Sequence, residues 1–186
     1  MRPMALALAV IPTLALATEV DVDELASASR EAVAQFAPLL KQELVTALEA
    51  GGPVNAIQVC SEIAPDIAAT VSRDAGLTVA RTSLKYRNPD NAPDDWEREV
   101  LQDFESRRAA GESAEALEHY ELVESGGDRR FRYMKAIPTA ELCVRCHGTQ
   151  LGAEVEAKLE QLYQEDQARG FEVGDIRGAF TVSKGL

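Results

Sequence analysis

The sequence predicts an α+β protein in which a small antiparallel sheet is flanked by helices. Three observations lead to this fold class. Apolar residues recur at three- and four-residue spacing over long stretches, which is typical of helices, and shorter stretches alternate between apolar and polar residues, which is typical of strands. A Gly-Gly pair joins two of the alternating stretches and predicts a β-hairpin.

Residues 1–17 have the pattern of a secretory signal peptide. Arg2 is followed by an uncharged apolar run whose last three residues, ALA, form the small-residue pattern that signal peptidase cuts. The run from Pro3 to Ala17 is 15 residues long, whereas a membrane-spanning helix needs about 20. We therefore expect a cleaved leader, one domain over residues 18–186, and a soluble mature protein in the bacterial periplasm with no membrane span.

The composition narrows the possible partners. The 186-residue chain carries 19 Lys and Arg against 31 Asp and Glu, a formal net charge of −12. A negative field of this size disfavours nucleic acid and anionic lipid and favours basic partners. Three cysteines are an odd number for an exported chain, so at least one thiol has a role outside a disulfide.

The first predicted helix runs from about residue 23 to residue 50 and ends at Gly51-Gly52-Pro53. A second helix follows, and its apolar spacing places Cys60 on the inward face. Pro65 lacks an N–H, so we expect this helix to bend just after Cys60.

The remaining predicted elements follow in order: a strand over 77–82, a helix over 94–108, hairpin strands over 117–124 and 131–137, a helix over 153–168 and a last strand over 175–183. In the second hairpin strand the alternation places Phe131 and Tyr133 on the core side. Met134 falls on the opposite side, together with Arg130 and Arg132.

The pentapeptide CVRCH, residues 143–147, is the strongest functional signal. Cys143 and Cys146 lie on the same side of one helical turn, and His147 follows on that face. The two thiols can form thioethers with haem while the imidazole coordinates the iron. A structural zinc site would need a second Cys/His pair, and a thioredoxin-like redox pair would open a helix in a βαβ unit. We therefore predict one covalent haem c.

Three side chains beyond the leader are candidates for the second axial position: Cys60, His119 and Met134. A cysteine on an apolar helix face is often a buried core residue, although thiolate coordination would occupy a thiol that is otherwise open to oxidation. His119 lies among acidic residues, and Met134 falls on the arginine side of its strand. The residues alone leave this choice open.

Arg81, Lys85 and Arg87 form a basic cluster in an acidic chain. Two haem propionates need cations or solvent, and this cluster supplies charge-assisted hydrogen bonds of the required kind. Arg130 and Arg132 are alternatives for the same role. An ordinary surface loop with local salt bridges is the competing interpretation of the cluster.

Five segments in this order resemble the family of PAS-like c-type haem domains long catalogued only as a domain of unknown function: the Cys60 helix before SEIAP, then RTSLKYRNPDNAPDDWE, FRYMKAIP, CVRCHG and GDIRGAFTV. That family includes free periplasmic or lumenal proteins and the sensor regions of membrane-bound signalling kinases. The resemblance implies a PAS-like antiparallel sheet flanked by helices. It also implies an axial pair made of His147 and Cys60.

These observations favour a non-enzymatic role. The first hypothesis is a redox or small-gas sensor, responding to NO or CO, that passes its signal to another periplasmic protein. The alternative is a soluble periplasmic electron carrier with a basic redox partner. A haem peroxidase is the least favoured, because two possible axial ligands leave the iron without an open position.

Overall fold

In this computed structural model the chain is described over residues 20–186, so the predicted signal peptide lies outside the described residues. The elements are α1 (Val22–Gln58), the π-helix η1 (Val59–Ile63), α2 (Ala64–Ala75), β1 (Thr78–Thr82), the 3₁₀-helix η2 (Pro89–Asn91), α3 (Asp95–Ala109), β2 (Glu118–Ser125), β3 (Asp128–Pro138), α4 (Val144–His147), α5 (Ala153–Leu162) and β4 (Ile176–Gly185). None of the helices over these residues has the length and apolar character that crossing a membrane requires.

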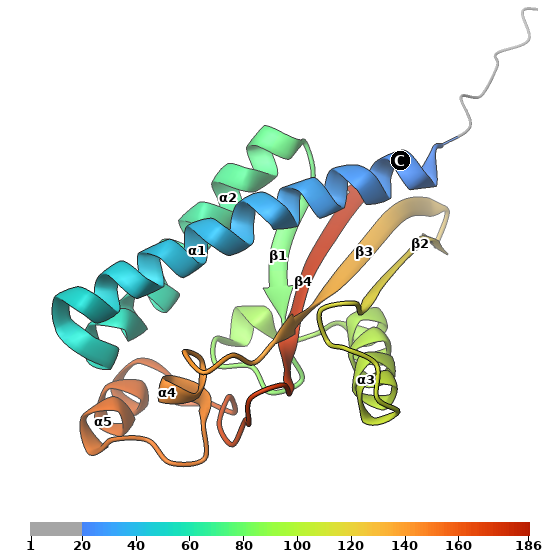
Figure 1. Cartoon of the computed structure of the whole chain (residues 1–186). Coiled ribbons are helices and arrows are strands. Elements are labelled where there is room, and N and C mark those ends of the chain that lie inside the picture. Colours follow the sequence, from blue (N-terminus) through green and yellow to red (C-terminus); the bar gives the residue numbers. More distant parts are fainter. Residues whose placement is uncertain (1–19) are drawn as a thin grey trace, which may run out of the picture.

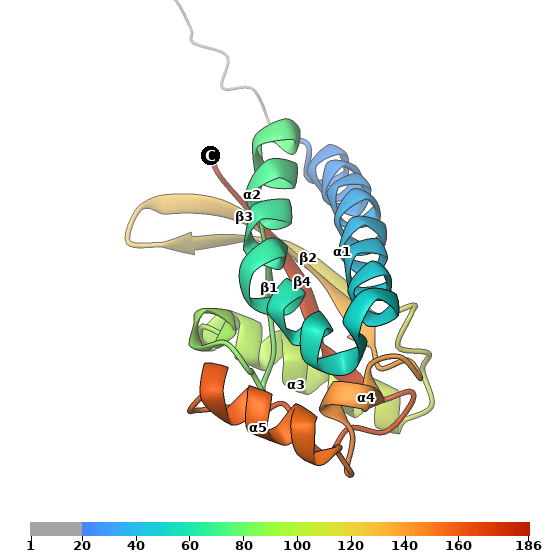
Figure 2. The same ribbon diagram turned by 90° about the vertical axis from the view of Figure 1, so that its left-hand side faces the viewer.

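The four strands form one antiparallel sheet in the order β1-β4-β3-β2. The α1 and α2 helices cover one face of this sheet, and α3 lies against the other face (Figure 1). The view turned by 90° shows α1 and α2 side by side above the strands, with α3, α4 and α5 below them (Figure 2). The prediction of an α+β chain with a long N-terminal helix and a flanked antiparallel sheet is confirmed.

The first core lies between the α1–α2 pair and the sheet. Asp21 begins α1 by accepting a hydrogen bond from the Glu24 N–H, which satisfies one of the exposed donors of the first turn. Phe36 of α1 packs edge-on against Phe180 of β4, with 5.3 Å between ring centroids. The other fully buried side chains of this core are Ala26, Ala32, Phe131, Tyr133 and Val182.

The second core lies between the sheet and α3, and it corrects one expectation. Met134 is fully buried there, against Phe104 of α3 and Leu117. The placement of Met134 on an arginine-lined face outside the core is therefore wrong, because α3 covers that face too. Arg132 remains at the edge of this layer, where its guanidinium stacks 4.2 Å from the Trp96 ring centroid.

The sequence predicts a helix end at Gly51-Gly52 and a bend just after Cys60, and the helical geometry changes at both places. Gly51 and Gly52 have non-helical backbone angles, so α1 is two helices that meet at a kink where the first predicted helix ends. The bend expected at Cys60 is the π-helix η1, in which the Ala64 N–H donates to the Val59 carbonyl five residues earlier. A π-turn carries one extra residue and is often found at functional sites.

The helix predicted over 153–168 ends earlier, at Leu162 of α5. The backbone of Tyr163 leaves the helical region, and the chain then turns so that the Asp166 carboxylate accepts the N–H of Ala168. Asp166 also pairs with Arg87, and this distant contact holds the segment in a non-helical form.

Candidate functional site

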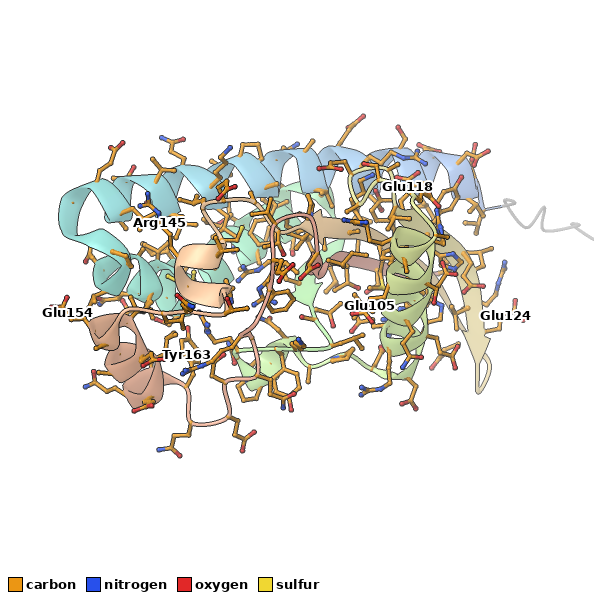
Figure 3. The ribbon with its side chains drawn as sticks, turned by 60° about the horizontal axis from the view of Figure 1, so that its bottom comes forward. Glu105, Glu118, Glu124, Arg145, Glu154 and Tyr163 are labelled. Carbon is orange, nitrogen blue, oxygen red and sulfur yellow. The ribbon has the colours of Figure 1, made fainter. Side chains whose placement is uncertain are left out.

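The CVRCH segment forms the single turn α4, as its spacing predicts. The Cys143 carbonyl accepts hydrogen bonds from the N–H groups of Cys146, at 3.1 Å, and His147, at 2.9 Å. Both cysteines carry free, half-buried thiols. Figure 3 shows this turn between the kinked end of α1 and helix α5, whose C-terminal end carries Tyr163.

The imidazole of His147 is held in one tautomer. Its Nδ1 lies 2.8 Å from the main-chain carbonyl oxygen of Ala168. Because a carbonyl only accepts, Nδ1 carries the proton and Nε2 keeps its lone pair. Burial lowers the pKa of His147 well below its usual value, and the positive charges of Arg177 and Arg87 lower it further. The ring is therefore neutral at pH 7, which is the form that binds a metal.

Cys60 lies at the same end of the molecule, half-buried on η1. Its thiol is close enough to Cys146 and Tyr163 for its charge to raise the pKa of both groups. Burial is the larger cause of the raised pKa in each of them. The structure thus brings the third cysteine of the chain to the α4 turn, although the two are far apart in sequence.

Two arginines gather at this site without carboxylate partners. Within residues 20–186 neither Arg81 nor Arg177 takes part in an ion pair. Burial, followed by repulsion from Arg87 and Arg81, lowers the pKa of Arg177 to about 10. Burial also lowers the pKa of Arg81. Cations crowded in this way favour a bound anion, since each added negative charge relieves their repulsion.

Arg177 was missed by the sequence analysis. It lies in the strand sequence IRGAFTV, where it is the single charged residue in an otherwise apolar stretch. A lone arginine in a buried strand is a usable signal, because such a charge needs a specific partner. Its guanidinium stacks 5.1 Å from the ring centroid of Phe171, and that ring in turn meets the His147 imidazole edge-on at 6.2 Å.

The other two predicted cations occupy different positions. Lys85 is exposed, with its amino group 5.1 Å from the Phe171 ring centroid. Arg87 is buried, and its donors bind Asp166 and the main-chain carbonyls of Cys146 and Ala168. Arg87 therefore connects the α4 turn with the loop after α5, and it also places a positive charge near His147.

The remaining candidates lie elsewhere. His119 is on β2, where its Nε2 is 3.3 Å from Glu121 and its ring is 5.8 Å from the Trp96 ring. Met134 is sealed in the α3 core. Arg132 forms ion pairs with Asp94 and Glu97, and Arg130 is exposed on β3. Among the described residues, the hydrogen bonds, ion pairs and ring contacts of these side chains go to β2, β3 and the α3 region and not to the α4 turn.

Two surface pockets border the site. One of about 310 Å³ is lined by Ser61, the neighbour of Cys60, and by Tyr163. The other, of about 390 Å³, is lined by Lys85 and Phe171 on the side of α3. The linings of these two pockets do not include His147 or Cys60.

The chemistry of this donor set fits a covalent haem. It contains two thiols on one turn, an imidazole with an unprotonated Nε2, a third thiol as a second ligand, and two arginines that have no carboxylate partner among the described residues. Over residues 20–186 no three His, Cys, Asp or Glu side chains converge in a way that would hold a bare metal ion.

Comparison with known proteins gives one family and one fold. No curated protein matches the chain. A solved structure of the cyanobacterial heme-protein Tll0287 matches with a TM-score of 0.67 at 23% identity, covering 90% of this chain and 98% of that one, and it shows the same fold. The Tll0287-like family matches residues 14–184, nearly the whole sequence. The chain therefore belongs to the Tll0287-like family.

Proposed function

We propose that this protein carries one haem c and acts in the periplasm as a sensor of redox state or of a small gas such as NO or CO. One observation carries the proposal: His147 presents a neutral Nε2 at the end of the molecule where the three cysteines and two arginines without carboxylate partners also lie. The description of its structural relative Tll0287 as a heme-protein supports the same cofactor.

Each group at the site has a distinct role in this proposal. Bound haem supplies an iron that changes oxidation state and accepts two axial ligands. The two cysteines of the α4 turn would hold it through thioethers, while His147 Nε2 and the Cys60 thiolate would coordinate its iron. Arg81 and Arg177 pair with the propionates, and Lys85 and Arg87 add positive charge around them.

The sensor role is supported by the segment that carries Cys60. This residue lies on the π-helix η1, which joins the kinked α1 to α2. Because a π-turn holds one extra residue, a change to α-helical geometry would rotate α2 relative to the end of α1 and would alter the position of Cys60 between them. Release of a bound Cys60 thiolate would thereby be coupled to a shape change in a helix pair that covers the sheet.

The test compares the haem-loaded mature protein with its Cys60→Ala variant by absorption and EPR spectroscopy in both redox states. We expect a low-spin ferric wild type with a thiolate signature that the variant loses. The ferrous variant should bind CO or NO faster than the ferrous wild type, because no thiolate has to be displaced. Ser61→Ala, at the next position of η1, is the matched control and should keep the wild-type spectrum.

Two results would contradict the proposal. Identical spectra for wild type and Cys60→Ala would make Cys60 a core cysteine and would favour the diffusible electron carrier, whose electron exchange with a basic partner should weaken as salt is added. A ferrous protein that binds neither CO nor NO would refute the gas-sensing branch.

The periplasmic location is part of the proposal. It rests on the leader pattern in residues 1–17 and on the covalent haem, because attachment of haem c takes place on the far side of the bacterial inner membrane. N-terminal sequencing of the mature protein should begin at Thr18. A mature chain that retains the leader would argue for an anchored protein.

A further inference from the structure

Arg87 and Asp166 form a buried ion pair next to Ala168, the residue whose carbonyl accepts the hydrogen bond of the His147 imidazole. Arg87 Nε donates to Asp166 Oδ1 at 3.0 Å, and the two side chains are only 7% and 3% exposed. Buried charges are tolerated only when further hydrogen bonds satisfy their remaining donors and acceptors. Here Asp166 Oδ2 also accepts from Arg169 Nε at 3.0 Å, and the other bonds of the pair go to the main chain around the site. Arg87 Nη2 donates to the Cys146 carbonyl at 2.6 Å and to the Ala168 carbonyl at 3.1 Å.

The ion pair holds the residue on which His147 depends. Asp166 Oδ1 accepts the N–H of Ala168 at 3.0 Å, and Arg87 binds the carbonyl of the same residue. That carbonyl is the one that accepts the Nδ1 proton of His147. Ala168 is therefore held at both its N–H and its C=O by the two partners of one ion pair.

The same ion pair also ties the loop to α4. By binding the carbonyl of Cys146 as well as that of Ala168, the Arg87 guanidinium fixes the distance between the α4 turn and the loop that follows α5. Main-chain bonds continue this contact, from the Phe171 N–H to the His147 carbonyl and from the Gly170 N–H to the Gly148 carbonyl. Arg87 thus binds the acceptor of the His147 hydrogen bond directly and also binds the residue before His147.

We propose that Arg87 and Asp166 are positioning residues for His147, which fix the tautomer and ring orientation in which Nε2 is presented to the haem iron. The inference rests on the proposed role of His147 as an axial ligand. Neither residue touches the reacting atoms, and both act through the Ala168 carbonyl. A hydrogen bond on the second nitrogen is the usual means of orienting a ligating histidine. In this chain an ion pair controls the acceptor of that bond.

The test uses the reduced, haem-loaded mature protein labelled uniformly with ¹⁵N, so that histidine ring nitrogens and core amides are observed in the same sample. The chain contains two histidines, so His119 on β2 is an internal reference. The measured quantity is the rate at which the His147 Nδ1 proton exchanges with solvent. A role in overall stability alone would not change this rate relative to that of the neighbouring core amides. The variants are Arg87→Gln and the milder Asp166→Asn, which keeps the shape and an acceptor oxygen.

Arg107→Gln is the matched control, since it removes an exposed ion pair with Glu112 far from the site. We expect Nδ1 exchange to accelerate about tenfold in both test variants, the change that corresponds to one ordinary hydrogen bond lost. In the control it should stay within about twofold, the size expected for a surface pair. Arg87→Lys should behave like Arg87→Gln, because an ammonium cannot reproduce the planar fork of donors.

Wild-type exchange in a folded Asp166→Asn or Arg87→Gln protein would overturn the inference. If Arg87→Gln does not fold, Asp166→Asn alone decides. A different NMR result would show that the proposed function itself is wrong. In that case the His147 ring signals of the wild type would show no haem-induced shift, and the axial role and the inference built on it would both be lost.

Discussion

The Nδ1 atom of His147 donates a hydrogen bond of 2.8 Å to the main-chain carbonyl of Ala168. This bond places the proton on the nitrogen that faces the loop after α5 and leaves Nε2 unprotonated on the other side. Burial and the surrounding arginines lower the pKa of the ring. A histidine held in this state binds iron at neutral pH without first losing a proton, and it also makes the stability of the fold depend on pH.

The first prediction concerns the haem-free chain in acid. Below about pH 6.5 an unfolded histidine takes up a proton, whereas the folded chain resists protonation because the pKa of His147 is lowered. The unfolded state then binds more protons, so stability falls as pH falls. We expect the free energy of unfolding to drop by about 2 kcal/mol between pH 7 and pH 5, measured by urea denaturation.

Two variants check the assignment to this side chain. His147→Gln should flatten the pH dependence over that interval, because the titrating group is gone. His119→Gln should keep the wild-type slope. A slope that survives in His147→Gln would assign the effect to other groups.

The second prediction concerns the reduction potential. Reduction adds negative charge at the iron, and a nearby cation stabilises it. Arg177→Gln should therefore lower the potential of the haem-loaded protein by roughly 30 to 60 mV, up to about a tenfold change in the one-electron equilibrium. Arg129→Gln removes an exposed arginine that pairs with Glu124 near the hairpin turn. Its potential, measured by the same spectroelectrochemical titration, should match the wild type.

The third prediction follows from the position of Met134. This side chain is fully buried against Phe104 and Leu117, away from the α4 turn. Met134→Leu conserves volume, so we expect it to cost less than about 1.5 kcal/mol in the free energy of unfolding. The absorption spectrum of the haem-loaded variant should be unchanged. A spectral change would bring Met134 back as an axial ligand.

The fourth prediction concerns Gly178, which follows Arg177 on β4. It has a φ of +154°, and a Cβ atom there would collide with the Thr82 carbonyl and lie 3.0 Å from the Ser83 Cβ. Gly178→Ala should destabilise the protein by roughly 2 to 4 kcal/mol. Gly185→Ala, on the same strand with open space around it, should change stability by less than about 0.5 kcal/mol. Thermal denaturation of both variants provides the comparison.

Local patterns in the sequence predicted most of the elements correctly. The spacing of apolar residues predicted α1 and α3, and Gly126-Gly127 predicted the hairpin, because helices, strands and tight turns depend on neighbouring residues. The alternation in β3 also predicted correctly which residues share a face. It could not show that α3 covers the second face, and for that reason the face that carries Met134 was wrongly expected to lie outside the core.

The parts of the site that escaped prediction depend on distant residues. The segment after Leu162 is not helical, and there Asp166 pairs with Arg87. No local pattern near residue 166 indicates that partner. The acceptor for His147 is a main-chain carbonyl, and every residue has one. Only the α4 turn was predictable in detail, because its two thiols and its imidazole lie within five residues of one another.

The contacts around α4 join segments that are far apart along the chain, and this sets the order in which the molecule assembles. Contacts of long sequence separation carry the largest loop-closure cost and form late in folding. We expect a newly made chain to expose Cys143 and Cys146 before Arg87 and Asp166 pack beside them. Burial raises the pKa of the Cys146 thiol in the finished fold, and the thiolate is the reactive form. Under the proposed function, haem attachment before these contacts form would meet the thiol of Cys146 in its more reactive state.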